Sequence, residues 1–346
     1  MNVTSMKRFK SIPKTSFVVG VTASLIACDP PPVHAQPTTI AIQAADQGTP
    51  ISPDLIGVFF EDLNYAADGG LYAELIQNRS FEYSPAEQPS WGPLFAWELQ
   101  KRGGGADGSL GVSTMRSVHA NNPHYAILTV RTPGDGVGLA NGGFDGIPVQ
   151  AGESYVASFW AYQAYMGIMW GRGDNSKPMP VTLRLESTKG DVLAEAKLDI
   201  KGREWRKVTV PLKPERTVND ARLVLLAHEQ GALCLDMISL FPAETFRNRP
   251  NGLRADLAQT IADLKPKFMR FPGGCLVHAG SVHRYYDWKH SIGPVEQRRA
   301  GPNYAWGYHQ TLGLGYFEYF QFCEDIGAKP LPVVTAGVCC QHAGHS

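Results

Sequence analysis

The sequence predicts an α/β protein that contains a separate all-β segment. Near the start of the chain, and again after residue 242, strand-like apolar runs alternate with segments of helical spacing, which is typical of a parallel sheet. Between about residues 95 and 242 the pattern changes to short alternating runs divided by Gly, Pro, Asn and Asp clusters. Short strands with such frequent turns are typical of a β-sandwich. We therefore expect an all-β sandwich inserted into an alternating strand and helix architecture.

The first region, residues 36–94, is expected to hold an N-terminal strand and the first strand and helix unit. Residues 38–44 (TTIAIQA) predict a strand, and residues 55–62 (LIGVFFED) form a nearly continuous apolar run, typical of a strand buried on both faces. Residues 69–82 follow with Leu71, Leu75 and Ile76 at helical spacing, which predicts a helix.

The inserted region, residues 95–242, contains six runs that predict strands. They are residues 125–132, 154–162, 181–188, 205–212, 221–228 and 234–241. One of these runs begins a group of four aromatic residues, namely Trp160, Tyr162, Tyr165 and Trp170. Such residues either form a platform for a polysaccharide or face the core of the sandwich, and the sequence leaves both interpretations open.

The third region, residues 243–346, returns to alternating helix and strand. A helix is predicted over residues 253–264, with Asn251 as its N-terminal cap and four apolar residues on one stripe, namely Leu253, Leu257, Ile261 and Leu264. Residues 268–271 (FMRF) predict a strand, residues 316–326 a helix that ends at Gly327, and residues 331–337 a further buried strand.

The charge balance gives no electrostatic reason to expect nucleic acid or an anionic membrane as a partner. The 346 residues contain 32 Lys and Arg and 32 Asp and Glu, a formal net charge of zero, and both of those partners attract strongly basic surfaces. With 43% hydrophobic residues, the chain has enough apolar material for a large core. This composition suits a soluble protein with a neutral ligand.

Residues 1–35 are predicted to be a secretory signal. A basic start (MKRFKSIPK) precedes a short apolar run, and residues 33–35 (VHA) have the small-residue spacing of a cleavage site after Ala35. A competing prediction is that Leu25 to Cys28 (LIAC) is a lipoprotein processing box with a lipid anchor at Cys28. Both predictions place the protein outside the cytoplasm, either secreted or in the periplasm.

Three residues follow or lie in predicted parallel strands and are the candidate site residues. Glu61 ends the first apolar run, Arg270 lies within FMRF, and Cys275 follows the turn Pro272–Gly274. In β/α barrels the site lies at the carboxyl ends of the strands, and paired glycines allow the backbone to approach a ligand closely. Because a charge inside an apolar strand needs a partner, we expect Arg270 to meet a carboxylate.

Each of these residues also has a purely structural interpretation. Glu61 could cap the helix that follows it, Arg270 could form an internal ion pair, and Cys275 could be an inert buried thiol. Residues 283–311 are rich in Tyr, Trp, His and Asn, which either stack on sugars or pack a long excursion. The Cys and His residues near Cys275 and the C-terminus lack the paired C-x2-C spacing of a zinc site, so no metal is expected.

Three segments together resemble the secreted α-L-arabinofuranosidases of glycoside hydrolase family 51. They are residues 57–82, 251–278 and 308–333, and they include the strings FFED and RFPGGC. The resemblance implies a partial (β/α)8 TIM barrel, about its first three strands, with an inserted jelly-roll-like sandwich of carbohydrate-binding type. It further implies release of terminal L-arabinofuranose from arabinoxylan or arabinan with retention of configuration, without a cofactor.

The same resemblance implies roles for individual residues. Glu61 is similar to a glutamate that bonds substrate hydroxyls, Arg270 to an arginine that steadies the nucleophile, and Cys275 to a cysteine that touches the furanose ring. The family's two catalytic glutamates lie at later strand ends, the first in an Asn-Glu pair that this sequence lacks, so both are expected beyond Ser346. The alternative hypothesis is a non-catalytic protein that binds arabinoxylan through the sandwich.

Overall fold

The computed structural model describes residues 40–41, 48–164, 177–281 and 283–340. The chain divides into two compact units, Met1–Pro50 and Ile51–Ser346, and the elements below lie in the second. The predicted signal, Cys28, most of the predicted strand 38–44, Tyr165 and Trp170 lie outside the described residues. No helix in the part of the chain that the structure describes is long and apolar enough to span a membrane.

Three parallel strands form one small sheet in the order β1-β13-β16. They are β1 (Val58–Phe59), β13 (Phe268–Phe271) and β16 (Lys329–Pro332). Phe59 is 51% exposed, and all four residues of β16 are exposed. The expectation that the strands at residues 55–62 and 331–337 are buried is therefore wrong, because both are edge strands and only β13 has a neighbour on each side.

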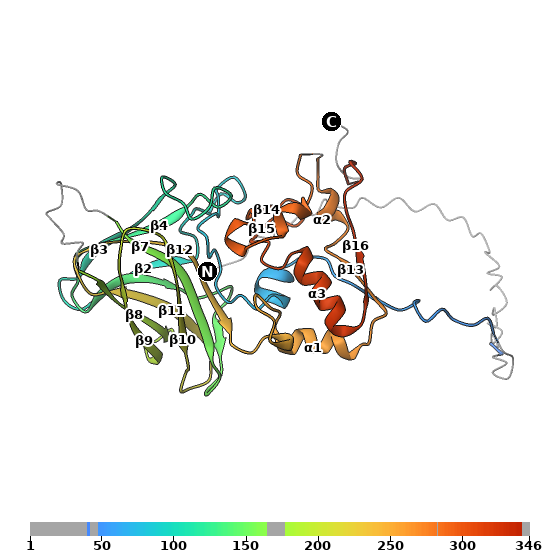
Figure 1. Ribbon diagram of the computed structural model, residues 1–346, viewed down its shortest axis with the longest axis horizontal. Helices are drawn as coiled ribbons and strands as arrows, with labels where there is room; N and C mark the ends of the chain where they lie inside the picture. The colour runs from blue at the N-terminus through green and yellow to red at the C-terminus, as the bar shows by residue number, and fades with distance from the viewer. Residues whose placement is uncertain (1–39, 42–47, 165–176, 282, 341–346) are drawn as a thin grey trace, which may run out of the picture. The chain divides into compact units, whose positions relative to one another are not determined.

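Two helices flank this sheet, as Figure 1 shows: α1 (Ala255–Asp263) and α3 (Tyr316–Ile326). Both confirm the helices predicted from apolar spacing. Helix α3 packs through Tyr319, whose ring stacks on Phe271 of β13 with 4.7 Å between centroids. It ends at Gly327, which adopts the left-handed conformation with φ of 69° that glycine favours. Asn251 does not cap α1 as predicted, because the cap position is Arg254.

Shorter elements connect these parts. They are the turns η1 (Ala67–Leu71), η3 (Phe246–Asn248), α2 (Cys275–His278), η4 (Trp288–Ser291) and η5 (Val295–Gln297), and the hairpin β14 (Gly301–Asn303) and β15 (Tyr308–Gln310). The helix predicted over residues 69–82 is wrong. Beyond η1 the chain is extended and turning, because the buried carboxylate of Glu74 accepts hydrogen bonds from the backbone of Ile76 and Leu240.

Two antiparallel sheets occupy the inserted region. One has the order β10-β7-β12-β4-β3, and the other has the order β2-β5-β11-β8-β9, with β6 paired to β11. The strands are β2 (Trp97–Arg102), β3 (Asp107–Ser113), β4 (Tyr125–Thr132), β5 (Gly136–Asn141), β6 (Ile147–Val149), β7 (Tyr155–Gln163), β8 (Met179–Glu186), β9 (Val192–Ile200), β10 (Arg206–Leu212), β11 (Val218–Ala227) and β12 (Gly231–Pro242). Each of the six predicted runs overlaps a strand.

The two antiparallel sheets share one apolar core. Alternate residues of facing strands, such as Leu128, Phe159 and Leu225, are buried in it, as the period of two in a strand requires. Two core members come from the segment before the first of these strands. Ile76 and Phe81 are fully buried there, and the Phe81 ring lies 5.3 Å from that of Trp97. Residues assigned by sequence to the first region therefore complete this core.

A chain of buried polar contacts links the inserted region to helix α3. Glu74 accepts a hydrogen bond from Ser239 of β12 and contacts Arg79. Arg79 donates to the Tyr72 hydroxyl, which donates to Asn251, and Asn251 donates to Glu318 of α3. Buried polar groups are costly unless partnered, so these contacts fix how the two regions meet.

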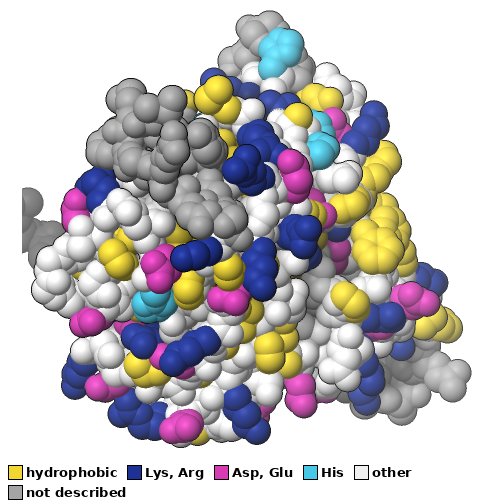
Figure 2. Space-filling model, turned by 60° about the vertical axis from the view of Figure 1, so that its left-hand side comes forward, with side chains coloured by type: hydrophobic (Ala, Val, Ile, Leu, Met, Phe, Trp, Pro, Cys, Tyr) yellow, Lys and Arg dark blue, Asp and Glu magenta, His cyan; other side chains and the backbone are white. Residues whose placement is uncertain are grey.

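The surface is mixed in charge. On the face drawn in Figure 2, Lys and Arg side chains alternate with Asp and Glu side chains rather than gathering by sign. This distribution agrees with the zero formal net charge of the sequence.

Replacing Phe81 with alanine is expected to destabilise the protein by about 3–5 kcal/mol, because the change removes a fully buried ring from the shared core. The measurement is the free energy of unfolding from urea denaturation. The control is Leu99→Ala on β2, where the side chain is 37% exposed. Equal losses for the two variants would contradict the assignment of residues 76–81 to this core.

Candidate active site

The parallel register brings the first two strand ends together. Phe59 of β1 lies opposite Arg270 of β13. The pairing continues past the strands, because the Phe60 amide donates to the Arg270 carbonyl at 2.8 Å and the Asp62 amide to the Pro272 carbonyl at 3.0 Å. Glu61 therefore lies beside the turn that leads to Cys275.

One carboxylate oxygen of Glu61 is fully used by the protein. Its Oε1 accepts hydrogen bonds from the amides of Gly274 at 3.1 Å and Leu276 at 3.0 Å, and from the Trp306 indole at 3.4 Å. The Oε2 atom has no partner among the described residues. Glu61 thus caps the first turn of α2. A capping role was one of the structural interpretations, although for the helix that follows Glu61 in sequence. The second carboxylate oxygen of Glu61 stays available as an acceptor.

The first glycine of RFPGGC is explained by close approach, whereas the second has room for a side chain. A Cβ at Gly273 would lie 2.7 Å from Cγ of Glu61, and one at Gly274 would lie 3.5 Å from Nη2 of Arg270. A side chain at Gly273 would therefore displace Glu61. The same geometry places the Arg270 guanidinium beside the backbone that Glu61 holds.

Arg270 has an aromatic partner instead of the expected carboxylate. Its guanidinium lies over the Phe59 ring, 4.2 Å from the centroid. Within the ranges that the structure describes, no ion pair of Arg270 is found, so the predicted carboxylate partner is not among these residues. A cation stacked on a half-exposed ring remains able to pair with an anion.

Cys275 is the first residue of α2 and is partly exposed. Its sulfur lies 3.6 Å from that of Cys340, without a disulfide. The contact with Cys340, together with burial and the nearby charge of Glu61, raises the pKa of the Cys275 thiol. The thiol is therefore a weak nucleophile, which favours a contact role over a chemical one. We call Glu61, Arg270, Cys275 and Trp306 the strand-end cluster.

Sequence reasoning missed the residue that holds this cluster together, Asp62. Its buried carboxylate accepts hydrogen bonds from the Tyr308 hydroxyl at 2.6 Å, the Ala67 amide at 3.0 Å and the Gln310 side chain. Its carbonyl accepts from Asn303 at 2.9 Å. Asp62 therefore fixes the hairpin β14–β15 over the strand ends.

The hairpin in turn positions Trp306. The Trp306 amide donates to the Asn303 side chain at 3.0 Å, and the indole reaches Glu61. Nearby, the Asp68 carboxylate accepts from the Thr311 amide at 2.6 Å and the Thr311 hydroxyl at 2.7 Å. The acidic pair Glu61–Asp62 after an apolar run was a visible signal, but the hairpin residues that bond to Asp62 lie more than 240 residues away.

Burial raises the pKa of Asp62 to about 6, and the nearby charge of Asp68 acts in the same direction. The hydrogen bonds from Tyr308, Gln310 and Ala67 oppose the rise because they stabilise the carboxylate. The residue that anchors the hairpin is thus poised to change its charge in mildly acidic solution.

Comparisons with known proteins point to one group of enzymes. The family model for the Alpha-L-arabinofuranosidase 1 domain matches residues 260–346. The chain is 41% identical over 333 residues to the extracellular exo-alpha-L-arabinofuranosidase of Streptomyces chartreusis, across 91% of this chain and 37% of that protein. It is 32% identical over 352 residues to Alpha-L-arabinofuranosidase 1 of Arabidopsis thaliana, across 98% of this chain and 49% of that protein.

A solved structure extends the likeness to the fold. An arabinose-bound family 51 α-L-arabinofuranosidase matches with a TM-score of 0.71 at 31% identity, across 84% of this chain and 45% of that chain. The chain spans less than half the length of these three relatives. The fold is similar to that of this glycoside hydrolase over most of the chain. The resemblance is confirmed, and the chain is related to the α-L-arabinofuranosidases of glycoside hydrolase family 51 over most of its length.

The raised pKa of Asp62 predicts a pH-dependent stability. The folded protein holds a proton up to about pH 6 that the unfolded chain, with the ordinary pKa of 3.8, has already released. The free energy of unfolding should therefore fall as pH rises through this window. Because Asp62→Asn lacks this titration, the stability of the natural protein relative to the variant should fall by about 2.4 kcal/mol between pH 4 and 7.

Urea denaturation at a series of pH values measures this difference. Asp145→Asn, which changes an exposed carboxylate, is the matched control for a general effect of charge. A relative stability of Asp62→Asn that stays constant across the window would show that Asp62 does not titrate there.

Proposed function

We propose that the protein is a retaining α-L-arabinofuranosidase that releases terminal L-arabinofuranose from arabinoxylan or arabinan. The observation that carries the proposal is the match to an arabinose-bound family 51 enzyme across 84% of this chain. The presence of Glu61, Arg270 and Cys275 at adjoining strand ends supports it, because such ends form the sites of β/α barrels. No cofactor is part of the proposal.

The proposal assigns an architecture to each region. The sheet β1-β13-β16 forms about the first three strands of a (β/α)8 TIM barrel, and the two antiparallel sheets form an inserted jelly-roll-like module of carbohydrate-binding type. The boundaries are those expected from sequence: 1–35 for the signal, 36–94 for the first barrel unit, 95–242 for the module and 243–346 for the barrel continuation.

The strand-end cluster is assigned to substrate binding. Glu61 offers Oε2 to a sugar hydroxyl while Oε1 stays bound to the backbone of α2. Arg270 offers an unpaired cation to an anionic group of the enzyme, and Cys275 touches the furanose ring. A retaining mechanism needs two carboxyl groups about 5–5.5 Å apart, and the proposal does not assign that pair to the described residues.

The proposal places the protein outside the cytoplasm. Residues 1–35 act as a secretory signal cleaved after Ala35, with lipid attachment at Cys28 as the competing outcome. The Streptomyces chartreusis relative is named as extracellular, which supports export. A purely non-catalytic arabinoxylan-binding protein is not favoured, because the relatives that match most of this chain are named arabinofuranosidases.

Glu61→Gln separates the structural and substrate-binding roles of this residue. The amide keeps an oxygen to accept from Gly274 and Leu276 but replaces the free carboxylate oxygen with a donor. We expect the affinity for an aryl α-L-arabinofuranoside, measured by isothermal titration, to fall roughly 10- to 100-fold, the effect of losing a hydrogen bond to a charged group.

The melting temperature of Glu61→Gln should stay close to that of the natural protein, whereas Glu61→Ala should lose stability as well as affinity. Glu204→Gln, at an exposed position, is the control. Unchanged affinity in Glu61→Gln would refute the role of Glu61, and absence of arabinofuranoside binding by the natural chain would refute the substrate assignment.

A further inference from the structure

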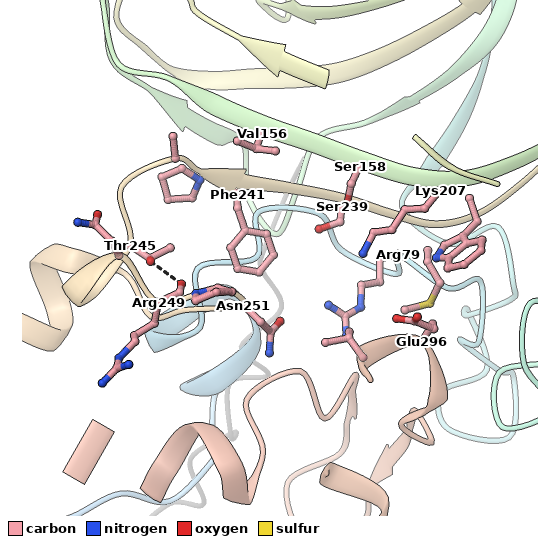
Figure 3. Close-up of a pocket in the computed structure, with 17 residues that line it drawn as sticks. Arg79, Val156, Ser158, Lys207, Ser239, Phe241, Thr245, Arg249, Asn251 and Glu296 are labelled. Atoms are coloured by element: carbon pink, nitrogen blue, oxygen red, sulfur yellow. Dashed lines mark hydrogen bonds between the residues drawn. The ribbon is translucent and has the colours of Figure 1, made fainter. Parts of the chain in front are cut away.

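A cavity lies where the inserted region meets the loop that leads to α1 and the turn η5. Its volume is about 350 Å³, within the range of small-molecule sites. Figure 3 shows Val156, Ser158 and Phe241 on the strands along one side, with Asn251 and Glu296 on the opposite side. Nothing in the strand-end cluster lines it.

Strand alternation explains why this wall is polar. Ser158 of β7 pairs in register with Ser239 of β12, and their neighbours Ala157 and Leu240 are buried in the apolar core. Successive side chains of a strand point to opposite faces, so the serines point outward into the cavity. The Ser158 hydroxyl can donate and accept there, whereas the Ser239 hydroxyl, which donates to Glu74, can only accept.

Arg79 lines the cavity, and its Nη2 has no hydrogen-bond partner among the described residues. The side chain is 3% exposed. Its Nη1 donates to the Tyr72 hydroxyl at 3.0 Å and lies 3.4 Å from Glu74 Oε2, while Nε has no hydrogen-bond partner in the described residues. An unpaired buried donor is costly. Figure 3 shows Arg79 between Asn251 and Glu296; the Nε atom itself has almost no exposed surface, so a bound group would accept a hydrogen bond from Nη2.

The rest of the lining combines an aromatic ring with balanced charge. Trp160 is half-buried on β7, and Lys207 of β10 is its partner in register. Lys207 and Glu296 carry opposite charges, and no ion pair of either is found within the described ranges. The charge of Arg249 is committed to Asp325 at 2.6 Å. The opposite charges around the cavity therefore balance in number, which suits a neutral ligand better than an acidic one.

We propose that this cavity is a second glycan-binding site for a neutral oligosaccharide, distinct from the site of hydrolysis. Sugars present an apolar face that packs on an aromatic ring and hydroxyls that bond to Ser, Asn and Arg groups, and these groups meet here. The choice of a xylan-derived ligand rests on the proposed function. The existence of the site does not, because it uses none of the residues assigned to catalysis or to the strand-end cluster.

The test is isothermal titration of the full chain with xylotetraose, a neutral probe without arabinose. We expect binding that weakens at least about tenfold in Trp160→Ala, since loss of the aromatic contact is worth about 1.4 kcal/mol or more. Ser158→Leu should weaken binding similarly because the larger side chain fills the cavity from the outer face of β7. Thr129→Leu is the matched control, because it enlarges an outward residue of β4 in the same sheet and does not line the cavity.

Three outcomes overturn the proposal: no xylotetraose binding, binding that Ser158→Leu and Trp160→Ala leave unchanged, or preference for a xylotetraose carrying a glucuronate. Glu61→Gln separates this proposal from the proposed function. Retained xylotetraose binding in Glu61→Gln supports a distinct site, whereas its loss assigns the binding to the strand-end cluster.

Discussion

The buried carboxylate of Asp62 is the interaction on which the candidate site depends. Strand β1 alone is two residues long and could not order a long excursion above it. Asp62 supplies what the strand lacks, because its hydrogen bonds to Tyr308, Gln310 and the Ala67 amide hold the hairpin β14–β15 in place. Trp306 then reaches Glu61, and Glu61 orders the turn that carries Cys275. Burying a carboxylate is costly unless hydrogen bonds partner it. The position of the hairpin and the position of the strand end therefore depend on each other.

Local sequence patterns predicted those strands and helices whose conformation is determined by their own residues. Alternation located β4, β7, β8, β10, β11 and β12, and apolar spacing located α1 and α3. The missed strands are rich in glycine, as in β5 (GVGLAN), or are polar on one face, as in β9 (VLAEAKLDI), and they gain their order from neighbours. Residues 69–82 have helical spacing but no helix, since the buried Glu74 binds backbone groups that a helix would use.

The candidate site divides in the same way. The alternation of strands and helices, together with the motifs FFED and RFPGGC, was enough to predict that Glu61, Arg270 and Cys275 lie close together. The reason for a glycine at position 273 became clear from the structure, because Glu61 packs against it. The partners of Asp62 could not be predicted, because they come from an excursion whose composition fits packing as well as sugar binding. Trp306 is the aromatic residue of this excursion that contacts Glu61. Its residue type alone does not separate it from the other aromatic residues nearby in the sequence.

Because Ile76 and Phe81 insert into the core of the antiparallel sheets, those sheets are not joined to the preceding segment by a flexible linker. The segment that carries them continues through Glu74 and Tyr72 to the loops beside α3. A polysaccharide bound to the antiparallel sheets would thus be held at a fixed distance and angle from the parallel sheet. Binding to the antiparallel sheets would therefore help by orienting the polysaccharide, whereas a module on a flexible linker would help by raising the local concentration of the polysaccharide.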